Sequence, residues 1–113
     1  MKARIHHAAI LTADFEWYVN FFREVFHMTV ARTAGEAPNR QLWFAEGIQI
    51  NELARDAEIF PENCACDHIS LGVDLDPVAA AKLAIQYGCR KAEGKGDHWF
   101  VLPNGVMMEM KPF

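Results

Sequence analysis

The chain contains an internal repeat, which restricts its possible folds more than any other feature. The stretch "HHAAILTADFEWYVNFFREVFHM" resembles the later stretch "DHISLGVDLDPVAAAKLAIQYGC", and His7 aligns with His68, 61 residues further on. The same offset places His27 on Gly88, directly after the helical pattern in each copy. Two copies of about 50 residues are too long to be units of a small solenoid repeat. We therefore expect one domain of 113 residues built from a duplicated module.

Each copy predicts a strand, a helix and then three strands. In the first copy, a helix with a stripe of apolar side chains starts near Thr12 or Asp14, both of which are suitable N-cap residues. In the second copy, Asp76, Pro77 and Gly88 mark the start and the end of the helix. The strands are predicted at residues 5–11, 28–33, 41–46 and 48–53, and at 66–73, 89–93, 97–102 and 105–111. The first module covers about residues 1–53, the linker 54–63 and the second module about 64–113.

The composition is that of an ordinary soluble domain, with a net charge of −4 and no cluster of basic residues. Nucleic acid and an anionic membrane surface are therefore not expected as partners. No apolar run approaches the ~20 residues of a membrane-spanning helix. The cysteines, Cys64, Cys66 and Cys89, are odd in number, which indicates a reducing cytoplasm rather than a disulfide framework.

A carboxylate interrupts the apolar strand pattern "GVMMEMKP". Side chains alternate between the two faces of a strand, so Val106, Met108 and Met110 share one face, which suits packing on a helix. Met107 and Glu109 then share the opposite face. An ionised carboxylate that is buried without a partner costs several kcal/mol. Glu109 is therefore expected to meet either solvent or a cation.

Two histidines are predicted to lie on the same side of the fold as Glu109. On the strand at residues 66–73, Ile69, Leu71 and Val73 form the face that packs on the helix. His68 then projects to the other side together with Ser70, and the repeat places His7 likewise. A single His or Glu on a strand is usually a surface residue, whereas three at matching positions of a repeat indicate a shared role.

Three motifs resemble the vicinal oxygen chelate superfamily, which includes glyoxalase I, methylmalonyl-CoA epimerase, extradiol dioxygenases and the fosfomycin- and bleomycin-resistance proteins. The motifs are "HAAILTADFEWYVNFF", "DHISLGV" and "LPNGVMMEM", and the resemblance covers nearly the whole chain. It implies an α+β fold in which two βαβββ modules form a curved mixed sheet, a half-barrel cavity with the helices on its outer face. It also implies one divalent metal (Ni, Zn, Mn, Fe or Co) bound by His7, His68 and Glu109. Imidazole and carboxylate ligands suit these metals.

The resemblance leaves a fourth ligand position open. Metal-dependent isomerases of the superfamily carry Glu or Gln in the last strand of the first module. The step from Gly47 to Asn51 equals the step from Gly105 to Glu109, so the repeat places Asn51 there. In a regular strand the next residue, Glu52, points toward the helix, and a one-residue bulge would turn it round. Both Asn51 and Glu52 remain candidates.

These features favour a metal-dependent glyoxalase-like isomerase, lyase or epimerase. Its small substrate would chelate the metal through vicinal oxygens, and Glu109 or Glu52 would move the proton. The alternative is a non-catalytic protein of the bleomycin-resistance type that binds a small molecule. An extradiol dioxygenase ranks lower because no His or Tyr is placed as its acid–base pair. Fosfomycin resistance is also disfavoured, because Ala9 stands where those enzymes carry a functional Thr.

Further expectations concern the substrate cavity and the oligomeric state. The residues expected to line the cavity are Gln49, Ser70, Met107 and His98. Trp17 and Phe21 lie outside the apolar stripe of the first helix, four residues apart. Exposed aromatic pairs are enriched at interfaces, so we expect a homodimer that uses them.

Overall fold

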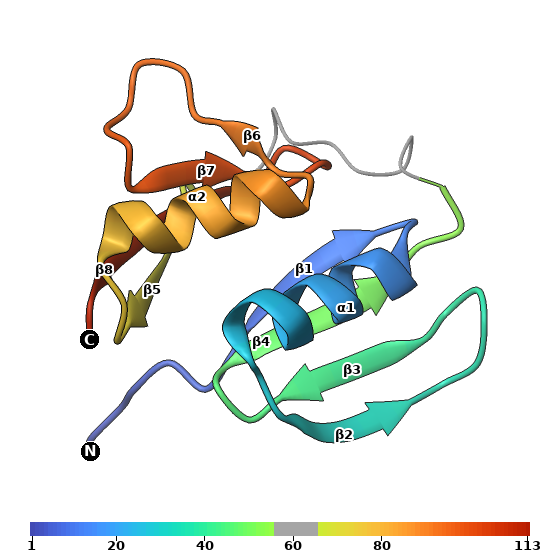
Figure 1. Cartoon of the computed structure of the whole chain (residues 1–113). Coiled ribbons are helices and arrows are strands. Elements are labelled where there is room, and N and C mark those ends of the chain that lie inside the picture. Colours follow the sequence, from blue (N-terminus) through green and yellow to red (C-terminus); the bar gives the residue numbers. More distant parts are fainter. Residues whose placement is uncertain (56–65) are drawn as a thin grey trace. The chain divides into compact units, whose positions relative to one another are not determined.

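The structure of the chain is a computed structural model that describes residues 1–55 and 66–113. The chain divides into two compact units, residues 1–59 and 60–113. Each unit contains a four-stranded mixed sheet and one helix, as Figure 1 shows. From residue 56 onward, the predicted linker lies outside the described residues.

The two units have the same order of elements. The first unit contains β1 (Ala8–Thr12), α1 (Phe15–Phe26), β2 (Val30–Ala34), β3 (Gln41–Phe44) and β4 (Ile48–Glu52). The second unit contains β5 (Ile69–Val73), α2 (Pro77–Tyr87), β6 (Arg90–Lys91), β7 (Trp99–Val101) and β8 (Met107–Pro112). The strand orders are β1-β4-β3-β2 and β5-β8-β7-β6, and in each sheet only the first pair is parallel. The prediction of an α+β fold with two βαβββ modules is confirmed.

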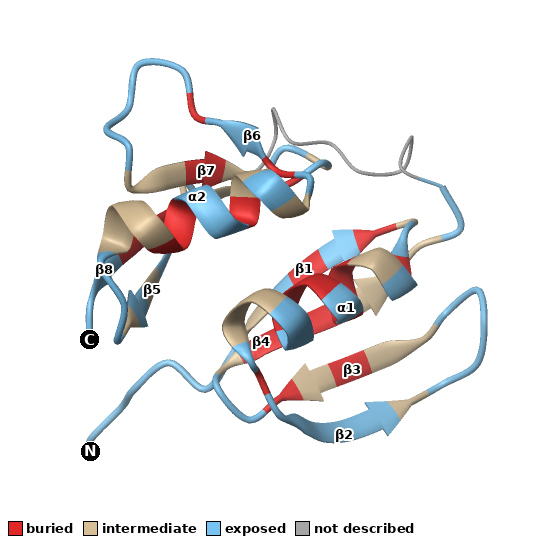
Figure 2. Ribbon diagram, in the orientation of Figure 1, coloured by how far each residue is buried: buried red, intermediate tan, exposed pale blue. Residues whose placement is uncertain are grey.

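Each helix packs its apolar face on its own sheet, and Figure 2 shows the buried residues along these facing sides. In the first unit, Phe22 and Ile50 are fully buried. In the second unit α2 contacts β8, where Met108 and Met110 are also fully buried. The prediction that Met108 and Met110 form the helix-packing face is confirmed. The opposite face of each sheet is therefore the one that is left for polar side chains.

The helix ends follow the repeat. The Asp76 carboxylate accepts a hydrogen bond of 3.0 Å from the backbone N–H of Ala79, as expected for an N-cap. Asp14 precedes α1 without such a bond, and its own N–H donates to Thr12 Oγ1 at 2.9 Å. The C-cap residues are His27 and Gly88, which the sequence alignment had paired. His27 adopts φ = 54°, a left-handed conformation that is costly for a residue with a Cβ.

We predict that His27→Gly stabilises the protein by about 1 kcal/mol, because glycine adopts this cap conformation without the Cβ clash. Urea unfolding would measure the change. The matched control is Gly88→Ala, which introduces a Cβ at φ = 138° and should destabilise the protein. A lower free energy of unfolding for His27→Gly would contradict the prediction.

The strand β2 forms an exposed edge of the first sheet. Its residues from Val30 to Thr33 are exposed, and Figure 2 shows this strand pale over most of its length. Its pairing with β3 shifts between Val30 and Arg32, so that Ala31 is an extra residue. The Arg32 guanidinium lies 4.6 Å from the centre of the Trp43 ring, over its face.

Two expectations differ from the structure, namely the bounds of two strands and the exposure of Phe21. The strands β1 and β5 are shorter than predicted, so His7 and His68 each lie one residue before a strand. Phe21 is fully buried, and its ring stacks on Trp17 with centres 5.2 Å apart. Phe21 also contacts the rings of Phe22 and Phe26, which widens the buried side of α1 beyond the predicted stripe. The proposed use of Phe21 in a dimer interface is therefore wrong.

Within the described residues, no helix combines the length and apolar character that membrane crossing needs.

Candidate metal and substrate site

Glu109 lies at the centre of the sheet in the second unit. It is on β8 opposite Ser70 of β5 and Trp99 of β7, so its carboxylate is flanked on both sides. The Ser70 hydroxyl donates a hydrogen bond of 2.8 Å to Oε1. Only 11 % of the Glu109 side chain is exposed, and it points away from the helix-packing methionines. The carboxylate is thus held in a defined position on the open face.

Three basic side chains lie close to this carboxylate. The Nε2 atom of His68 lies 3.7 Å from Oε1, and the Nε2 atom of His98 lies 3.5 Å from Oε2. The ammonium group of Lys111, on the same strand, lies 3.5 Å from Oε2. The hydrogen bond from Ser70 and the charge of Lys111 lower the pKa of Glu109, although burial opposes them. Glu109 is therefore an anion at neutral pH, and it suits a cation better than a neutral ligand.

Aromatic and acidic neighbours fix the orientation of His68. Its ring stands edge-on to Trp99, with ring centres 4.7 Å apart. Its Nδ1 atom lies 2.8 Å from Oδ2 of Asp67, and this hydrogen bond lowers the pKa of the Asp67 carboxyl. The other ring nitrogen, Nε2, faces Glu109. His68 and Glu109 are thus brought together as the sequence predicted.

In the first unit, His7 is exposed and lies next to His6. The two Nδ1 atoms are 2.8 Å apart, and the rings meet edge to face with centres 5.1 Å apart. The N–H of Ala8 donates to the carbonyl of Gly47 at 2.8 Å, which anchors the start of β1 on the β4 side. His7 therefore occupies the same place before β1 as His68 does before β5.

The sheet register identifies Gln49 as the counterpart of Glu109. Glu109 lies opposite Ser70, and Gln49 lies opposite Ala9. Ser70 and Ala9 are each two residues after the candidate histidine of their unit. The antiparallel neighbours agree, because a tryptophan lies opposite Gln49 on β3 and opposite Glu109 on β7. Gln49 donates a hydrogen bond of 2.7 Å to Asn51, so the two amides lie on one face.

This register corrects the alignment that placed Asn51 at the position of Glu109. Gly47 and Gly105 do match, because each donates its N–H to the carbonyl three residues earlier, at 3.1 and 2.9 Å. However, pairing with the first strand begins at Ile48, one residue after Gly47, and at Met108, three residues after Gly105. The parallel strand is shifted by two residues between the units. Asn51 consequently lies two residues beyond Gln49, which is the residue equivalent to Glu109.

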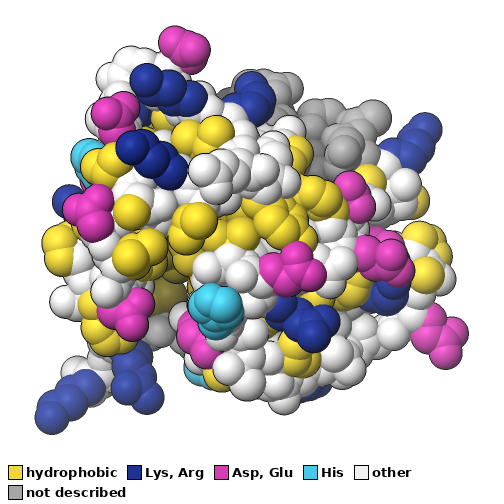
Figure 3. Space-filling view, viewed as in Figure 1, with side chains coloured by type: hydrophobic (Ala, Val, Ile, Leu, Met, Phe, Trp, Pro, Cys, Tyr) yellow, Lys and Arg dark blue, Asp and Glu magenta, His cyan; other side chains and the backbone are white. Residues whose placement is uncertain are grey.

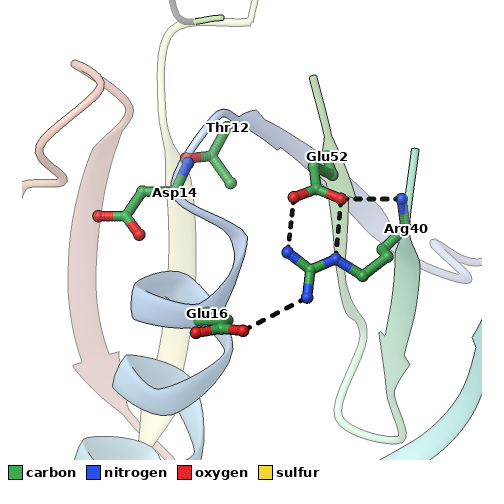
Figure 4. Close-up of polar contacts among 5 residues, drawn as sticks. All are labelled: Thr12, Asp14, Glu16, Arg40 and Glu52. Atoms are coloured by element: carbon green, nitrogen blue, oxygen red, sulfur yellow. Dashed lines mark hydrogen bonds and ion pairs between the residues drawn. The ribbon is translucent and has the colours of Figure 1, made fainter. Parts of the chain in front are cut away.

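Glu52 lies on the helix side and is bound by Arg40, as Figure 4 shows. The Arg40 Nη2 and Nε atoms lie 2.7 and 2.8 Å from Oε2 and Oε1 of Glu52. The Arg40 backbone N–H also donates to Oε1, and the guanidinium reaches Glu16 of α1 at 3.5 Å. It also lies 4.6 Å from the centre of the Phe15 ring. The hydrogen bonds from Arg40 lower the pKa of Glu52.

Pairing in β4 is continuous from Ile48 to Glu52, so no bulge turns Glu52 round. Glu52 is therefore engaged in a structural ion pair on the face opposite Gln49 and Asn51. Arg40 and Lys111 were not predicted as partners of these carboxylates. Lys111 follows Glu109 by two residues, and this spacing on a strand was a signal for a shared face. Arg40 lies in a loop, and its sequence position carries no such signal.

The wider electrostatic features fit the composition. On the face in Figure 3, acidic and basic side chains are interspersed, and neither sign forms a continuous patch. Among residues 1–55 and 66–113, no three His, Cys, Asp or Glu side chains form a group that could hold a metal. Of the remaining predicted cavity residues, Met107 pairs with Val101 at the start of β8, and it is half-buried. Cys64 lies outside the described residues.

Solved structures with this fold include enzymes and resistance proteins. No protein-family profile matches the sequence, and no curated protein matches it. Glyoxalase I of Leishmania major superposes with a TM-score of 0.74 at 16 % identity, over 98 % of this chain and 87 % of that one. The fosfomycin resistance protein FosX of Mesorhizobium loti gives 0.74 at 17 % identity, over 100 % and 94 %. A FosX mutant of Listeria monocytogenes, complexed with Mn(II) and a dihydroxypropylphosphonic acid, gives 0.73 at 16 % identity, over 99 % and 93 %.

The chain therefore has the fold of the vicinal oxygen chelate superfamily, as the sequence motifs predicted. At these identities the likeness concerns the fold. The function has to be argued from the side chains on the open face of each sheet.

Proposed function

We propose that the protein is a metal-dependent enzyme of the glyoxalase-like isomerase, lyase or epimerase class, which acts on a small substrate with vicinal oxygens. The observation that carries the proposal is the pair formed by His68 and Glu109, whose Nε2 and Oε1 atoms lie 3.7 Å apart. A neutral imidazole nitrogen and a carboxylate oxygen are ligands that Ni, Zn, Mn, Fe and Co accept. The FosX mutant with this fold was solved with Mn(II), which supports a divalent metal.

In the first unit, His7 and Gln49 are proposed as candidate metal ligands. His7 precedes β1 as His68 precedes β5, and Gln49 occupies the register position of Glu109. Gln49 thus replaces Asn51 as the candidate ligand. Asn51 accepts a hydrogen bond from the Gln49 amide. Because Gln49 is a neutral amide, the candidate ligands include one carboxylate, that of Glu109.

The remaining groups have separate tasks in this proposal. When bound, the metal would act as a Lewis acid that polarises the substrate oxygens. Glu109 is the proposed base, because Glu52 is occupied by Arg40 and the exchange of protons between two glutamates is not available. Ser70 holds one oxygen of Glu109, and Lys111 stabilises its negative charge. His98 and Met107 are proposed to contact the substrate, His98 from the loop before β7 and Met107 from the start of β8.

A second candidate, a metal-free binding protein, is favoured by one observation. Glu109 already has Lys111 and His98 as basic neighbours, and the described residues contain no complete metal-binding group. In that case the open face would bind a small molecule directly. The first proposal also includes a homodimer, which sedimentation would test. It includes a cytoplasmic location as well, which cell fractionation would test.

We predict that the purified protein holds one divalent metal per chain and that His68→Ala loses it. Loss of one imidazole ligand should lower the metal affinity at least about tenfold, because even outer-shell partners contribute that much. Elemental analysis and competition with a chelating dye would measure both proteins. His27→Ala is the control, because His27 is the C-cap residue of α1 and is not a candidate ligand. Wild-type protein that binds none of the five metals, even after reconstitution, would overturn the enzyme proposal in favour of the metal-free one.

A further inference from the structure

One row of side chains crosses all four strands of the first sheet, on the face opposite α1. In strand order from β1 to β2, the row consists of Ala9, Gln49, Trp43 and Arg32. Residues that lie directly opposite each other on neighbouring strands share a face of the sheet. The Arg32 guanidinium lies over the face of the Trp43 ring, 4.6 Å from its centre. The positive charge of the edge strand is therefore directed inward along the row.

The charge of Arg32 has no counter-charge in the described parts of the chain. Among residues 1–55 and 66–113, neither an ion pair nor a hydrogen bond joins this side chain to a carboxylate. The other strand-paired residues on this face, outside the row, are all neutral: Leu11, Ala34, Gln41 and Asn51. Arg32 is thus the one charged side chain among the paired positions of the open face.

The second unit repeats this arrangement with one difference. Trp99 lies opposite Glu109 as Trp43 lies opposite Gln49, and the Lys95 ammonium lies over the Trp99 ring, 4.8 Å from its centre. There, the carboxylate of Glu109 provides an anion within the row. The amide of Gln49 provides none. The first unit therefore combines a cation stacked on tryptophan with a neutral side chain at the position of the anion.

We propose that this row, together with Asn51, binds the carboxylate group of a small organic molecule, and that Arg32 selects this group. The inference deepens the proposed function by naming monocarboxylates as the substrate class, and it rests on that function only in taking the bound molecule to be the substrate. A guanidinium presents its donors in a planar fork that matches the two oxygens of a carboxylate. Stacking on Trp43 restricts the Arg32 side chain, so less conformational entropy is lost when a ligand binds.

Amide donors and apolar surface lie on the same face. Nε2 of Gln49 donates a hydrogen bond of 2.7 Å to Oδ1 of Asn51. The side-chain nitrogen of Asn51 has no hydrogen-bond partner among the described residues, so its N–H groups can donate to a ligand oxygen. Trp43 is half-buried and Leu11 is 42 % exposed, and both offer contact area to the apolar part of a ligand.

The single charge of the face favours a carboxylate over a phosphate. A phosphate monoester carries a charge of about −1.5 to −2 at neutral pH, so it is best bound by more than one cation. A carboxylate carries one negative charge, which one guanidinium can balance. The paired positions of this face supply Arg32 and no second cation.

The test is a titration of the full chain in EDTA with benzoate, benzamide and phenyl phosphate, observed by ¹⁵N–¹H NMR. Benzoate should cause saturable shifts of the Arg32 Nε–H and Trp43 indole N–H signals. Arg32→Gln should bind benzoate at least about tenfold more weakly, because a charge-assisted hydrogen bond is lost. Arg32→Lys keeps the charge without the planar fork, so its affinity should be intermediate. The matched control is Arg23→Gln, which removes an exposed charge from the last turn of α1 and should match the wild type.

Asn51→Asp is a second variant of nearly unchanged size. It adds a negative charge to the face that carries Arg32 and should also weaken benzoate binding at least about tenfold. Circular dichroism would establish that each variant is folded.

Four results would overturn the inference. They are a wild type without saturable shifts, equal binding of benzamide, tighter binding of phenyl phosphate, or unchanged benzoate affinity in both Arg32→Gln and Asn51→Asp. Because EDTA removes divalent metals, these results are separate from metal binding. A protein that binds benzoate but takes up no metal would support the inference and refute only the metal-dependent function. A protein that binds metal but no benzoate would refute only the inference.

Discussion

Glu109→Gln is expected to lower the affinity for the divalent metal by more than about a hundredfold. The amide keeps the size of the side chain and can still accept the hydrogen bond from Ser70, so the fold should be preserved. The substitution removes the anionic ligand. The resulting loss of metal affinity should exceed the 10–100-fold effect that is typical of outer-shell partners. The variant should also lose any isomerase activity, because an amide is not a base at neutral pH.

The measurement is dye competition with Mn²⁺ and Zn²⁺ on both proteins, followed by elemental analysis. Glu93→Gln is the matched control, since Glu93 is exposed and lies in the loop after β6. If Glu109→Gln keeps its metal, the ligands are elsewhere and the proposed site is incorrect. If neither protein binds metal, the second candidate function is preferred.

Glu52→Gln is expected to lower the midpoint of thermal unfolding by roughly 5–10 °C while leaving the metal affinity unchanged. Glu52 is 8 % exposed in its side chain, and Arg40 binds both of its oxygens. The variant leaves the guanidinium of Arg40 without its main anionic partner. Arg40→Gln/Glu52→Gln removes both charges and should recover part of the lost stability.

The same ion pair predicts a pH dependence. Hydrogen bonds from Arg40 hold the pKa of Glu52 below the ordinary value of 4.5, so the pair stabilises the folded state at higher pH. This contribution is lost as the pH falls below 4.5 and through the lowered pKa in the folded state. The loss should be smaller in Glu52→Gln than in the wild type, which thermal scans between neutral and acidic pH would measure.

A comparison of Gln49→Ala with Asn51→Ala tests the register on the other face of β4. Gln49→Ala should reduce metal affinity more, because Gln49 occupies the position of Glu109. A loss of metal in Glu52→Gln, with none in Gln49→Ala, would show that this reading of the first unit is wrong.

Much of the fold could be predicted from the sequence, because the repeat, the caps and the alternation of apolar residues are local signals. Alternation assigned Met108 and Met110 to the helix side and Glu109 to the other side, and both assignments agree with the structure. It could not identify Gln49 as the counterpart of Glu109. A shift of two residues between neighbouring strands keeps every side chain on its face, so the pattern of faces is unchanged.

The contacts of Phe21 and Glu52 show a second limit. Phe21 lies outside an ideal apolar stripe, yet neighbouring aromatic rings of its own helix cover it. Glu52 is bound by Arg40 from the loop before β3, and the position of a loop side chain depends on the whole sheet. The Phe21 contacts lie within α1 and the Glu52 contact is tertiary, and an ideal apolar stripe predicts neither of them.

The exposed strand β2 has a consequence for the behaviour of the protein at high concentration. An unpaired strand edge is a template onto which a strand of another molecule can add, and this leads to aggregation. The extra residue Ala31 interrupts regular pairing along this edge, and Arg32 places a positive charge on it, with its guanidinium held over Trp43. Both are devices that discourage intermolecular pairing. The irregular pairing and the positive charge of β2 are therefore expected to disfavour the addition of a strand from another molecule at this edge.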